Sequence, residues 1–362
     1  MEKICKIIEK DGEEWVVFYH NFNEELTPQI LEFLSKHQKV EFGRDFNQPV
    51  YILPNSLTHL KFGFNFNQPV ENLPKSIKTL EFGHDFNQPV TYQTESSQNG
   101  KSPTLLPKCI KTIKFGSQFN KRVDNLPESL TYLEFGDCFN QLVDNLPNSL
   151  TYLVFDCEFN QPIDNLPQSL THLELGGEFN QPIDNLPSGL THLTFCGSFN
   201  QPVDNLPSGL THLTFYESFN QPVDNLPDSL THLIFGEEFN QPVDNLPNCL
   251  THLTFGYQFN QPVYNLPNSL THLEFGDQFN QFVNNLPKSL MYISFGKEFN
   301  KNLFAYDNKR KIPVLPNSII QIKLKKKKYN KPIIFIPTSL KRIEISHRYK
   351  HKLPDNIEVI KI

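Results

Sequence analysis

Histidine recurs at a fixed spacing through the middle of this 362-residue chain. The regular series consists of His172, His192, His212, His232, His252 and His272, with His59 upstream. Imidazole is a common metal ligand and the side chain that titrates closest to neutral pH. A metal site needs several ligands that converge on one point, and here neither a cysteine nor a carboxylate is fixed beside each histidine. The spacing predicts a column of histidines and no metal site.

Aspartate recurs with the same period, and each copy is followed by asparagine. The series consists of Asp124, Asp144, Asp164, Asp184, Asp204, Asp224 and Asp244. Calcium-binding loops place their carboxylates more densely, in an Asp-x-Asp-x-Asp-Gly pattern that this chain lacks. Asp-Asn pairs suit turns, where their side chains bond to nearby backbone groups. We expect solvated turns at these positions.

An enzyme needs a unique constellation, such as a nucleophile beside its base, and here each polar residue is one of many copies. The chain has no phosphate-binding Gly-x-x-x-x-Gly-Lys-Ser/Thr loop. Its six cysteines show no C-x-x-C pair and no regular spacing, which argues against a disulfide or zinc framework. The sequence therefore indicates a protein that is not an enzyme and has no cofactor.

The repeated unit is 20 residues long and is represented by Leu190 to Gly209, whose residues we number as positions 1 to 20. A Phe-Asn pair at positions 10 and 11 marks thirteen copies. Their phenylalanines are Phe46, Phe66, Phe86, Phe119, Phe139, Phe159, Phe179, Phe199, Phe219, Phe239, Phe259, Phe279 and Phe299. A fixed period of this length is typical of a solenoid.

Each position of the unit predicts a local structure. Apolar positions 4 and 6 alternate with polar positions 3 and 5, as in a half-buried strand, so neighbouring coils should pair as a parallel sheet. Prolines at positions 13 and 18 disfavour helix, which predicts an extended or polyproline-like convex side. Glycine at position 7 indicates a positive φ or a close approach between coils. We expect the phenylalanines of position 10 to form the core and the asparagines of position 11 to form an internal ladder.

The unit Leu-Pro-x-Ser-Leu-Thr-x-Leu-x-Phe-Gly-x-x-Phe-Asn-Gln-Pro-Val resembles the FNIP repeat, a branch of the leucine-rich-repeat superfamily found in social amoebae and in giant viruses of amoebae. The resemblance covers residues 40–300. It implies a mainly β, leucine-rich-repeat-like solenoid whose open sheet face binds proteins. Some family members carry an F-box at the N-terminal end, which would make the chain a substrate-receptor subunit of a ubiquitin ligase. In this sequence the segment offers one credible helix where an F-box has several.

The chain divides into three parts. Residues 1–40 predict a small α+β N-terminal cap, with a hairpin around an Asp-Gly turn and then a helix opened by Thr-Pro. Residues 41–300 hold the thirteen repeats, with a polar loop insertion near residues 91–103. Residues 301–362 predict degenerate basic coils and a C-terminal cap, as solenoids require at their ends.

The net charge is unevenly distributed along the chain. Residues 301–362 contain 16 Lys/Arg and 4 Asp/Glu, a net charge of +12, whereas the preceding residues contain 17 and 35, a net charge of −18. The basic patch Lys325, Lys326, Lys327 and Lys328 suggests weak binding to nucleic acid or to an acidic surface. The acidic body makes nucleic acid an unlikely main partner. No apolar run is long enough to span a membrane, and we expect a monomeric, cytoplasmic protein, in the host cytoplasm if viral.

Positions 3 and 5 vary from coil to coil within an otherwise constant template, as a binding surface requires. We therefore expect a protein–protein interaction scaffold whose partner, an unidentified protein, lies across the open sheet face. The residues expected on this face are Tyr132, Glu134, Tyr152, Val154, His172, Glu174, His192, Thr194, His212, Thr214, His232, Ile234, His252, Thr254, His272, Glu274 and Tyr292.

Overall fold

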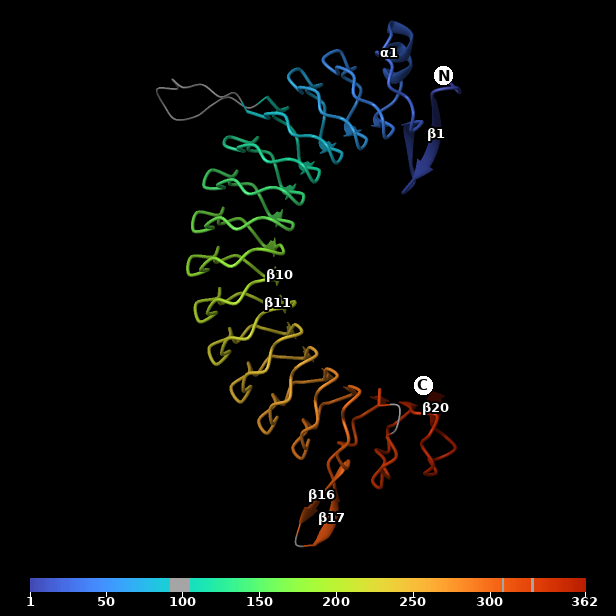
Figure 1. Cartoon of the computed structure of the whole chain (residues 1–362), viewed down its shortest axis with the longest axis vertical. Helices are drawn as coiled ribbons and strands as arrows, with labels where there is room; N and C mark the ends of the chain where they lie inside the picture. The colour runs from blue at the N-terminus through green and yellow to red at the C-terminus, as the bar shows by residue number, and fades with distance from the viewer. Residues whose placement is uncertain (92–104, 308, 327–328) are drawn as a thin grey trace. The chain divides into compact units, whose positions relative to one another are not determined.

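The computed structural model describes residues 1–91, 105–307, 309–326 and 329–362. The chain forms two compact units. Unit 1 comprises Met1–Gln181 and Asn185–Leu190, and unit 2 comprises Pro182–Asp184 and Thr191–Ile362. Each unit is a stack of coils built around short strands, and α1 is the only helix of the described residues (Figure 1). The predicted mainly β solenoid is confirmed.

Unit 1 contains β1 (Cys5–Lys10), β2 (Glu13–Phe18), α1 (Pro28–Leu34), β3 (Lys39–Glu41), β4 (His59–Lys61), β5 (Thr79–Glu81), β6 (Thr112–Lys114), β7 (Tyr132–Glu134), β8 (Tyr152–Val154) and β9 (His172–Leu175). Unit 2 contains β10 (His192–Phe195), β11 (His212–Phe215), β12 (His232–Ile234), β13 (His252–Thr254), β14 (His272–Glu274), β15 (Tyr292–Phe295), β16 (Phe304–Asp307), β17 (Arg310–Pro313), β18 (Gln321–Leu324), β19 (Arg342–Ile345) and β20 (Glu358–Lys361).

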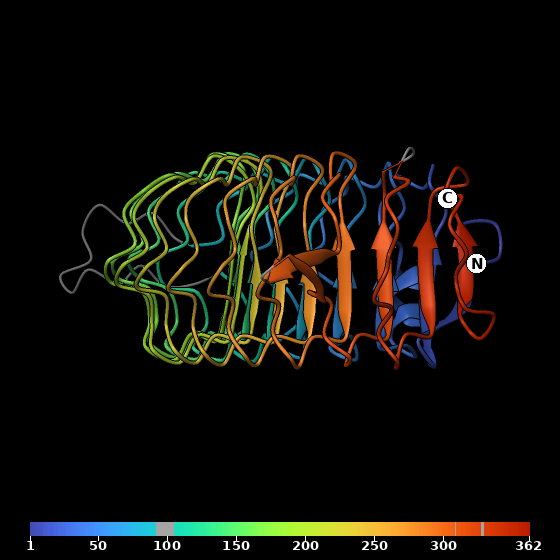
Figure 2. The ribbon, with the colours of Figure 1, turned by 90° about the horizontal axis from the view of Figure 1, so that it is seen from below.

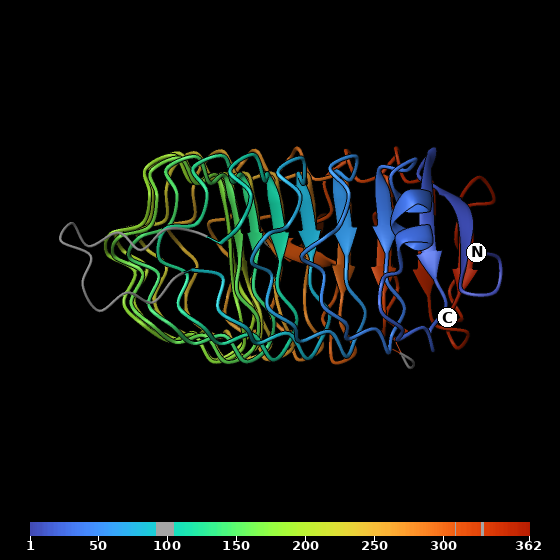
Figure 3. The ribbon, with the colours of Figure 1, turned by 90° about the horizontal axis from the view of Figure 1, so that it is seen from above.

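Strands of successive coils pair in parallel, with equivalent positions opposite each other. In unit 1 Tyr132 of β7 lies opposite Tyr152 of β8, and in unit 2 His212 of β11 lies opposite His232 of β12. The strands of unit 2 run side by side in Figure 2, and those of unit 1 in Figure 3. Because the register equals the repeat, every side chain of a given position falls into one column across the sheet.

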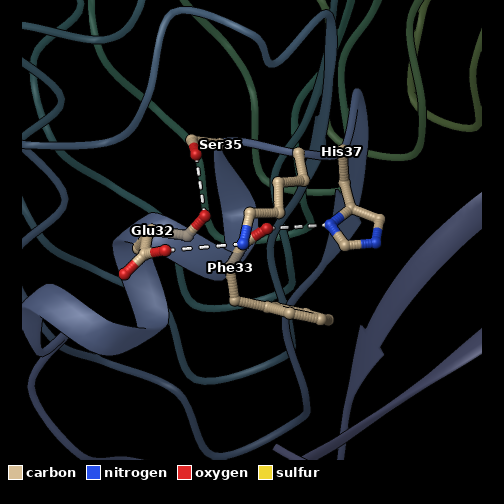
Figure 4. Close-up of polar contacts among 5 residues, drawn as sticks. Glu32, Phe33, Ser35 and His37 are labelled. Atoms are coloured by element: carbon tan, nitrogen blue, oxygen red, sulfur yellow. Dashed lines mark hydrogen bonds and ion pairs between the residues drawn. The ribbon is translucent and has the colours of Figure 1, made fainter.

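The N-terminal cap has the predicted hairpin and helix. β1 pairs antiparallel with β2 around Asp11 and Gly12, which both have positive φ, as a tight two-residue turn requires. The side chain of Thr27 accepts a hydrogen bond from the Ile30 amide and caps α1. Beyond the helix, His37 Nδ1 lies 2.9 Å from the Phe33 carbonyl (Figure 4).

The repeat pattern also extends into this cap. β2 pairs in parallel with β3, and the Phe22 ring stacks on that of Phe46 at 5.9 Å. The Asn23 side chain accepts a hydrogen bond from the backbone N–H of Asn47 at 2.8 Å. Phe22 and Asn23 thus occupy positions 10 and 11 of an additional coil, in which α1 stands in place of the usual extended segment.

Two columns of phenylalanine, at positions 6 and 10, lie in the core. The column at position 10 was expected there, and the column at position 6 packs against it. In unit 2 the ring of Phe239 lies 3.7 Å from that of Phe235 in its own coil. It lies 6.1 Å from the rings of Phe219 and Phe259 in the two adjacent coils. These side chains are almost fully buried, so the aromatic columns supply much of the apolar burial that holds successive coils together.

The asparagine ladder at position 11 is present in both units. In unit 2 the side-chain oxygen of Asn240 accepts hydrogen bonds from the Asn260 backbone N–H at 2.9 Å and from Gln261 Nε2 at 3.3 Å. A turn amide that would otherwise be left between coils is therefore satisfied by the preceding coil. The geometry repeats at nearly every step, which fixes how adjacent coils stack.

Glycine at position 7 allows a close approach between coils. A Cβ added to Gly256 would lie 1.8 Å from the carbonyl oxygen of Gly236. Among the described glycines only Gly12 has a positive φ. Of the two explanations that the sequence offered, close backbone contact is therefore the one that applies here.

We call the side of each unit that lies away from its strands the outer edge (Figure 1). The segments between the strands contain the prolines, and the Asp-Asn pairs in them lie in turns. In unit 2 Asn225 and Asn245 donate side-chain hydrogen bonds to Asp204 and Asp224, each at 3.0 Å. These aspartates lie in turns, as predicted, but their carboxylates bond to the asparagine side chain of the next coil and not to nearby backbone groups. Residues 92–104, which hold most of the predicted insertion, lie outside the described residues. Over the described part of the chain, no helix has the length and apolar composition needed to cross a membrane.

Gly189 offers a direct test of the coil-to-coil contacts at position 20. Other coils carry serine there, and the hydroxyl of Ser169 donates to the Leu150 carbonyl at 2.6 Å. A Cβ on Gly189 would meet no atom closer than 3.3 Å. We expect Gly189→Ser to raise the free energy of unfolding by about 1 kcal/mol, through the added hydrogen bond and a less flexible unfolded chain. Urea denaturation checks this, with Ser169→Gly as the reverse control; a loss of stability in Gly189→Ser would contradict it.

Candidate binding face

The strand face is the side of each sheet that carries positions 3 and 5, opposite the buried leucine of position 4. In unit 2 the carbonyl of Thr211 accepts the backbone N–H groups of both Thr231 and His232, at 2.9 and 3.0 Å. Equivalent bonds at each step hold the backbone beneath the face. In each unit the predicted face residues therefore form two adjacent columns, one of position 3 and one of position 5. The backbone hydrogen bonds between coils hold both columns in place.

In unit 1 the face carries a short stack of rings whose hydroxyls are bound to carboxylates. The Tyr152 ring lies 4.9 Å from that of Tyr132 and 5.0 Å from that of His172. The Tyr132 hydroxyl donates to Glu134 at 2.6 Å, and the Tyr152 hydroxyl donates to Glu174 at 3.0 Å. Burial and the neighbouring carboxylates raise the pKa of Tyr152, so this tyrosine stays protonated. Val154 lies half-buried between Glu134 and Glu174.

In unit 2 position 3 forms a column of stacked imidazoles, which we call the imidazole column. It consists of His192, His212, His232, His252 and His272. Successive ring centroids are 4.2 to 4.3 Å apart and the planes are inclined by no more than 12°. Tyr292 continues the column at 5.9 Å from His272. Because the rings are nearly parallel, their nitrogens point in the same direction and do not converge on one metal position.

Threonine hydroxyls of position 2 determine which imidazole nitrogen carries the proton. The Thr231 hydroxyl lies 2.9 Å from His232 Nδ1 and 3.1 Å from the Thr211 carbonyl oxygen. A hydroxyl has one hydrogen and a carbonyl can only accept, so both contacts are hydrogen bonds only if Nδ1–H donates to the hydroxyl. Nε2 then carries a lone pair. The same arrangement recurs at His212, His252 and His272.

Position 5 of unit 2 is uncharged over four consecutive coils. The column runs through Thr194, Thr214, Ile234 and Thr254 before it reaches Glu274. The Ile234 side chain is 41% exposed, which makes it the most exposed apolar residue of the strand face in either unit. A neutral strip with an exposed apolar centre is a surface that a protein partner can desolvate at low cost.

Comparison with known protein families shows which family the repeats match. The FNIP Repeat model matches twelve overlapping segments: residues 38–65, 46–85, 66–92, 102–138, 122–157, 139–178, 159–198, 179–218, 199–238, 219–258, 239–278 and 259–298. This chain belongs to the FNIP repeat family. The predicted resemblance is confirmed. Comparison with curated proteins gave no match.

Two solved structures are similar to this FNIP repeat chain. CroV588, from a giant virus and described as a novel circular LRR protein, is 41% identical with a TM-score of 0.83. The match covers 95% of this chain and 55% of CroV588, so the chain spans about half the length of that protein. YopM from Yersinia enterocolitica WA-314 is 18% identical with a TM-score of 0.52, over 90% of this chain and 71% of YopM. The second likeness supports the fold alone.

A second group of potential ligands lies at the strand exits of two FNIP coils in unit 1. Asp137, Asp156 and Cys157 each place one ligand atom within 4.8 Å of the others. A hydrogen bond with Asp156 is the main cause that raises the pKa of the Cys157 thiol to about 11. The thiol therefore keeps its proton, which disfavours metal binding at neutral pH. The repeat pattern did not predict this group, because Asp156 stands where most coils carry the glycine of position 7, and Asp137 and Cys157 occupy position 8, which varies from coil to coil.

The structure describes two of the four lysines of the basic patch, Lys325 and Lys326. Lys326 lies 3.7 Å from Glu298, and Lys325 lies near enough to Asp277 to lower the pKa of that carboxyl, although less than Lys297 does. Lys327 and Lys328 lie outside the described residues. The two described lysines thus lie near carboxylates of the two preceding coils, Glu298 and Asp277, which reduces the positive potential at this end of unit 2.

The imidazole column makes the stability of the FNIP solenoid dependent on pH. Burial, and then the charge of neighbouring imidazoles, lowers the pKa of His232 and of His252 below the reference value of about 6.5. The folded state then binds fewer protons than the unfolded state, so the stabilisation is fully present above about pH 6.5 and is lost as the pH falls. We expect lower urea midpoints at about pH 5.5 than at about pH 7.5. A His232→Gln/His252→Gln variant should show a smaller difference, and an unchanged difference would contradict this origin.

Proposed function

We propose that this FNIP repeat protein is a non-catalytic scaffold that binds another protein through its strand face. One observation carries the proposal. The face residues vary on a backbone that is held constant by coil-to-coil hydrogen bonds, and they include the exposed Ile234 beside the imidazole column. Rigid surfaces of this kind bind with little loss of conformational entropy. The leucine-rich-repeat fold is consistent with such a role.

A cytoplasmic location fits this proposal, because the six cysteines have no regular spacing of the kind found in the disulfide frameworks of secreted proteins. The alternative role at the basic end receives less support. The described lysines of the patch lie near acidic residues of the same unit, and the body of the chain would repel a phosphate backbone. The ubiquitin-ligase alternative also receives less support, because residues 1–40 contain a single helix of seven residues.

Affinity capture with paired variants tests the proposal. The purified chain is immobilised and the proteins it retains from a cell extract are identified by mass spectrometry. A Tyr152→Ser/Val154→Ser variant removes the anchors of unit 1, and a His232→Ser/Ile234→Ser variant removes those of unit 2. We expect a specific protein to be lost from at least one variant that circular dichroism shows to be folded.

The outer edge provides the matched control. In Asp184→Asn/Asp204→Asn/Asp224→Asn, asparagine can still accept the hydrogen bonds of the Asp-Asn turns. This variant should retain every specific protein that the unaltered chain retains. If both face variants capture the same proteins as the unaltered chain while the outer-edge variant loses them, the proposal is wrong.

A further inference from the structure

Exposed rings and carboxylates gather where β11, β12 and β13 leave the strand face of unit 2. We call this group the acidic rim. It consists of Tyr216, Glu217, Glu237, Glu238 and Tyr257. The side chains of Tyr216 and Tyr257 are 52% and 51% exposed. Within the described part of the chain, no ion pair involves any of the three glutamates.

The backbone brings the rim glutamates together. The Glu238 N–H donates to the Glu217 carbonyl at 2.9 Å, and the Gln258 N–H donates to the Glu237 carbonyl at 2.8 Å. The carboxylates therefore project from turns that are stacked one coil apart. Like charges on neighbouring coils repel one another, and a cationic partner group would relieve that repulsion.

The surface beside the rim supplies complementary groups. Ile234 lies three residues before Glu237 and offers an apolar contact. On the same strands, His232 and His252 of the imidazole column direct Nδ1–H to threonine hydroxyls, which leaves a lone pair on Nε2. Tyrosine rings bind guanidinium and ammonium groups through cation–π contacts. The three carboxylates, the two tyrosine rings and the Nε2 atoms of His232 and His252 are thus all groups that accept hydrogen bonds or attract positive charge.

We propose that the acidic rim and the imidazole column beside it bind a basic segment, rich in arginine or lysine, of a partner protein. The inference rests on the proposed function and specifies the chemistry of the partner at one part of the strand face. An acidic protein segment or a nucleic acid is disfavoured, because three carboxylates would face its charges.

Acidification should release the partner. The groups that face His232 are His212 on β11 and His252 on β13, with Thr214 and Thr254 diagonally opposite and Ile234 on its own strand. Glu274 and Tyr292 follow farther along the sheet, and the glutamates of the rim lie at the strand ends. Protonation converts the Nε2 acceptors of the imidazoles into cationic donors. At low pH the protonated imidazoles therefore repel a basic segment, whereas at neutral pH their Nε2 atoms accept hydrogen bonds from it.

Binding of a designed peptide tests the inference on the full chain. The probe is a fluorescent peptide of alternating arginine and serine, and its counterpart carries glutamate in place of arginine. Anisotropy titration measures both at about 0.15 M salt, where charges more than about 8 Å away are screened. We expect the arginine peptide to bind more tightly. Glu217→Gln/Glu237→Gln/Glu238→Gln should weaken it about tenfold or more.

The controls separate local recognition from overall charge. Asp184→Asn/Asp204→Asn/Asp224→Asn removes the same charge from the outer edge and should change the affinity less than about twofold. Affinity should fall between about pH 7.5 and 5.5, and His212→Gln/His232→Gln/His252→Gln should abolish that fall. Equal losses in the rim and outer-edge variants, or tighter binding of the glutamate peptide, would overturn the inference. If a captured protein depends on the face variants but not on the rim variant, the inference fails while the proposed function stands.

Discussion

Phe239→Ala should destabilise unit 2 by about 3–5 kcal/mol, the range typical of a fully buried phenylalanine. Its side chain is completely buried, with Phe235 at 3.7 Å and the rings of the two adjacent coils at 6.1 Å. Removal of the ring leaves a cavity that faces both neighbouring coils. In a solenoid the stability comes from contacts between nearest neighbours, so the loss weakens two interfaces at once.

Denaturant titration measures this effect, with Phe282→Ala as the control. The Phe282 side chain is 49% exposed, and Lys301 Nζ lies 5.0 Å from the centre of its ring. Its loss should cost less than about 1 kcal/mol. Similar losses in the two variants would show that the phenylalanine column does not form the core.

Gly256→Ala should destabilise unit 2 by about 2–3 kcal/mol, because the new methyl group has no room. The added Cβ would lie 1.8 Å from the Gly236 carbonyl oxygen and 2.2 Å from its carbon. Both are backbone atoms, so no side chain can rotate away to relieve the clash. The two coils must separate locally, which also strains the hydrogen bonds of the sheet.

Tyr216 shows how the chain accommodates a side chain at position 7. The Tyr216 N–H donates to the Phe195 carbonyl at 2.8 Å, so the backbone hydrogen bonds between β10 and β11 extend by one residue. In Gly256→Ala the substituted coil would have to pair in this altered way, although the adjacent coils carry glycine at position 7. Denaturant midpoints compared with Gly189→Ala, where the nearest atom is 3.3 Å away, check the prediction. An equal response of the two glycines would contradict it.

The repeat made most of the fold predictable. Each coil presents the same pattern to its neighbours, so the period alone set the parallel register, the phenylalanine core and the asparagine ladder. The coil around Phe22 escaped notice because α1 lengthens the interval to Phe46 beyond the usual 20 residues. The reason for glycine at position 7 could not be decided from the sequence, because both explanations require the same residue.

The strand face was predictable in its residues but not in its chemistry. Alternation of positions 3 and 5 placed His232 and Ile234 on the face, yet the tautomer of the imidazoles depends on the contacts of the Thr231 hydroxyl with the Thr211 carbonyl and with His232 Nδ1. The acidic rim was missed for a related reason. Tyr216 replaces the glycine of position 7, and the other members occupy positions 8 and 9, which vary from coil to coil, so only their stacking in space distinguishes them from solvated turns.

Calorimetric titration of the captured protein tests the central claim, that the strand face is the binding surface. The account predicts that Tyr152→Ser/Val154→Ser or His232→Ser/Ile234→Ser weakens binding about a hundredfold, as expected for anchor residues, while the outer-edge aspartate variant binds like the unaltered chain. If instead both face variants bind with full affinity, and deletion of residues 91–103 or neutralisation of Lys325 to Lys328 abolishes binding, then recognition belongs to the insertion or to the basic end.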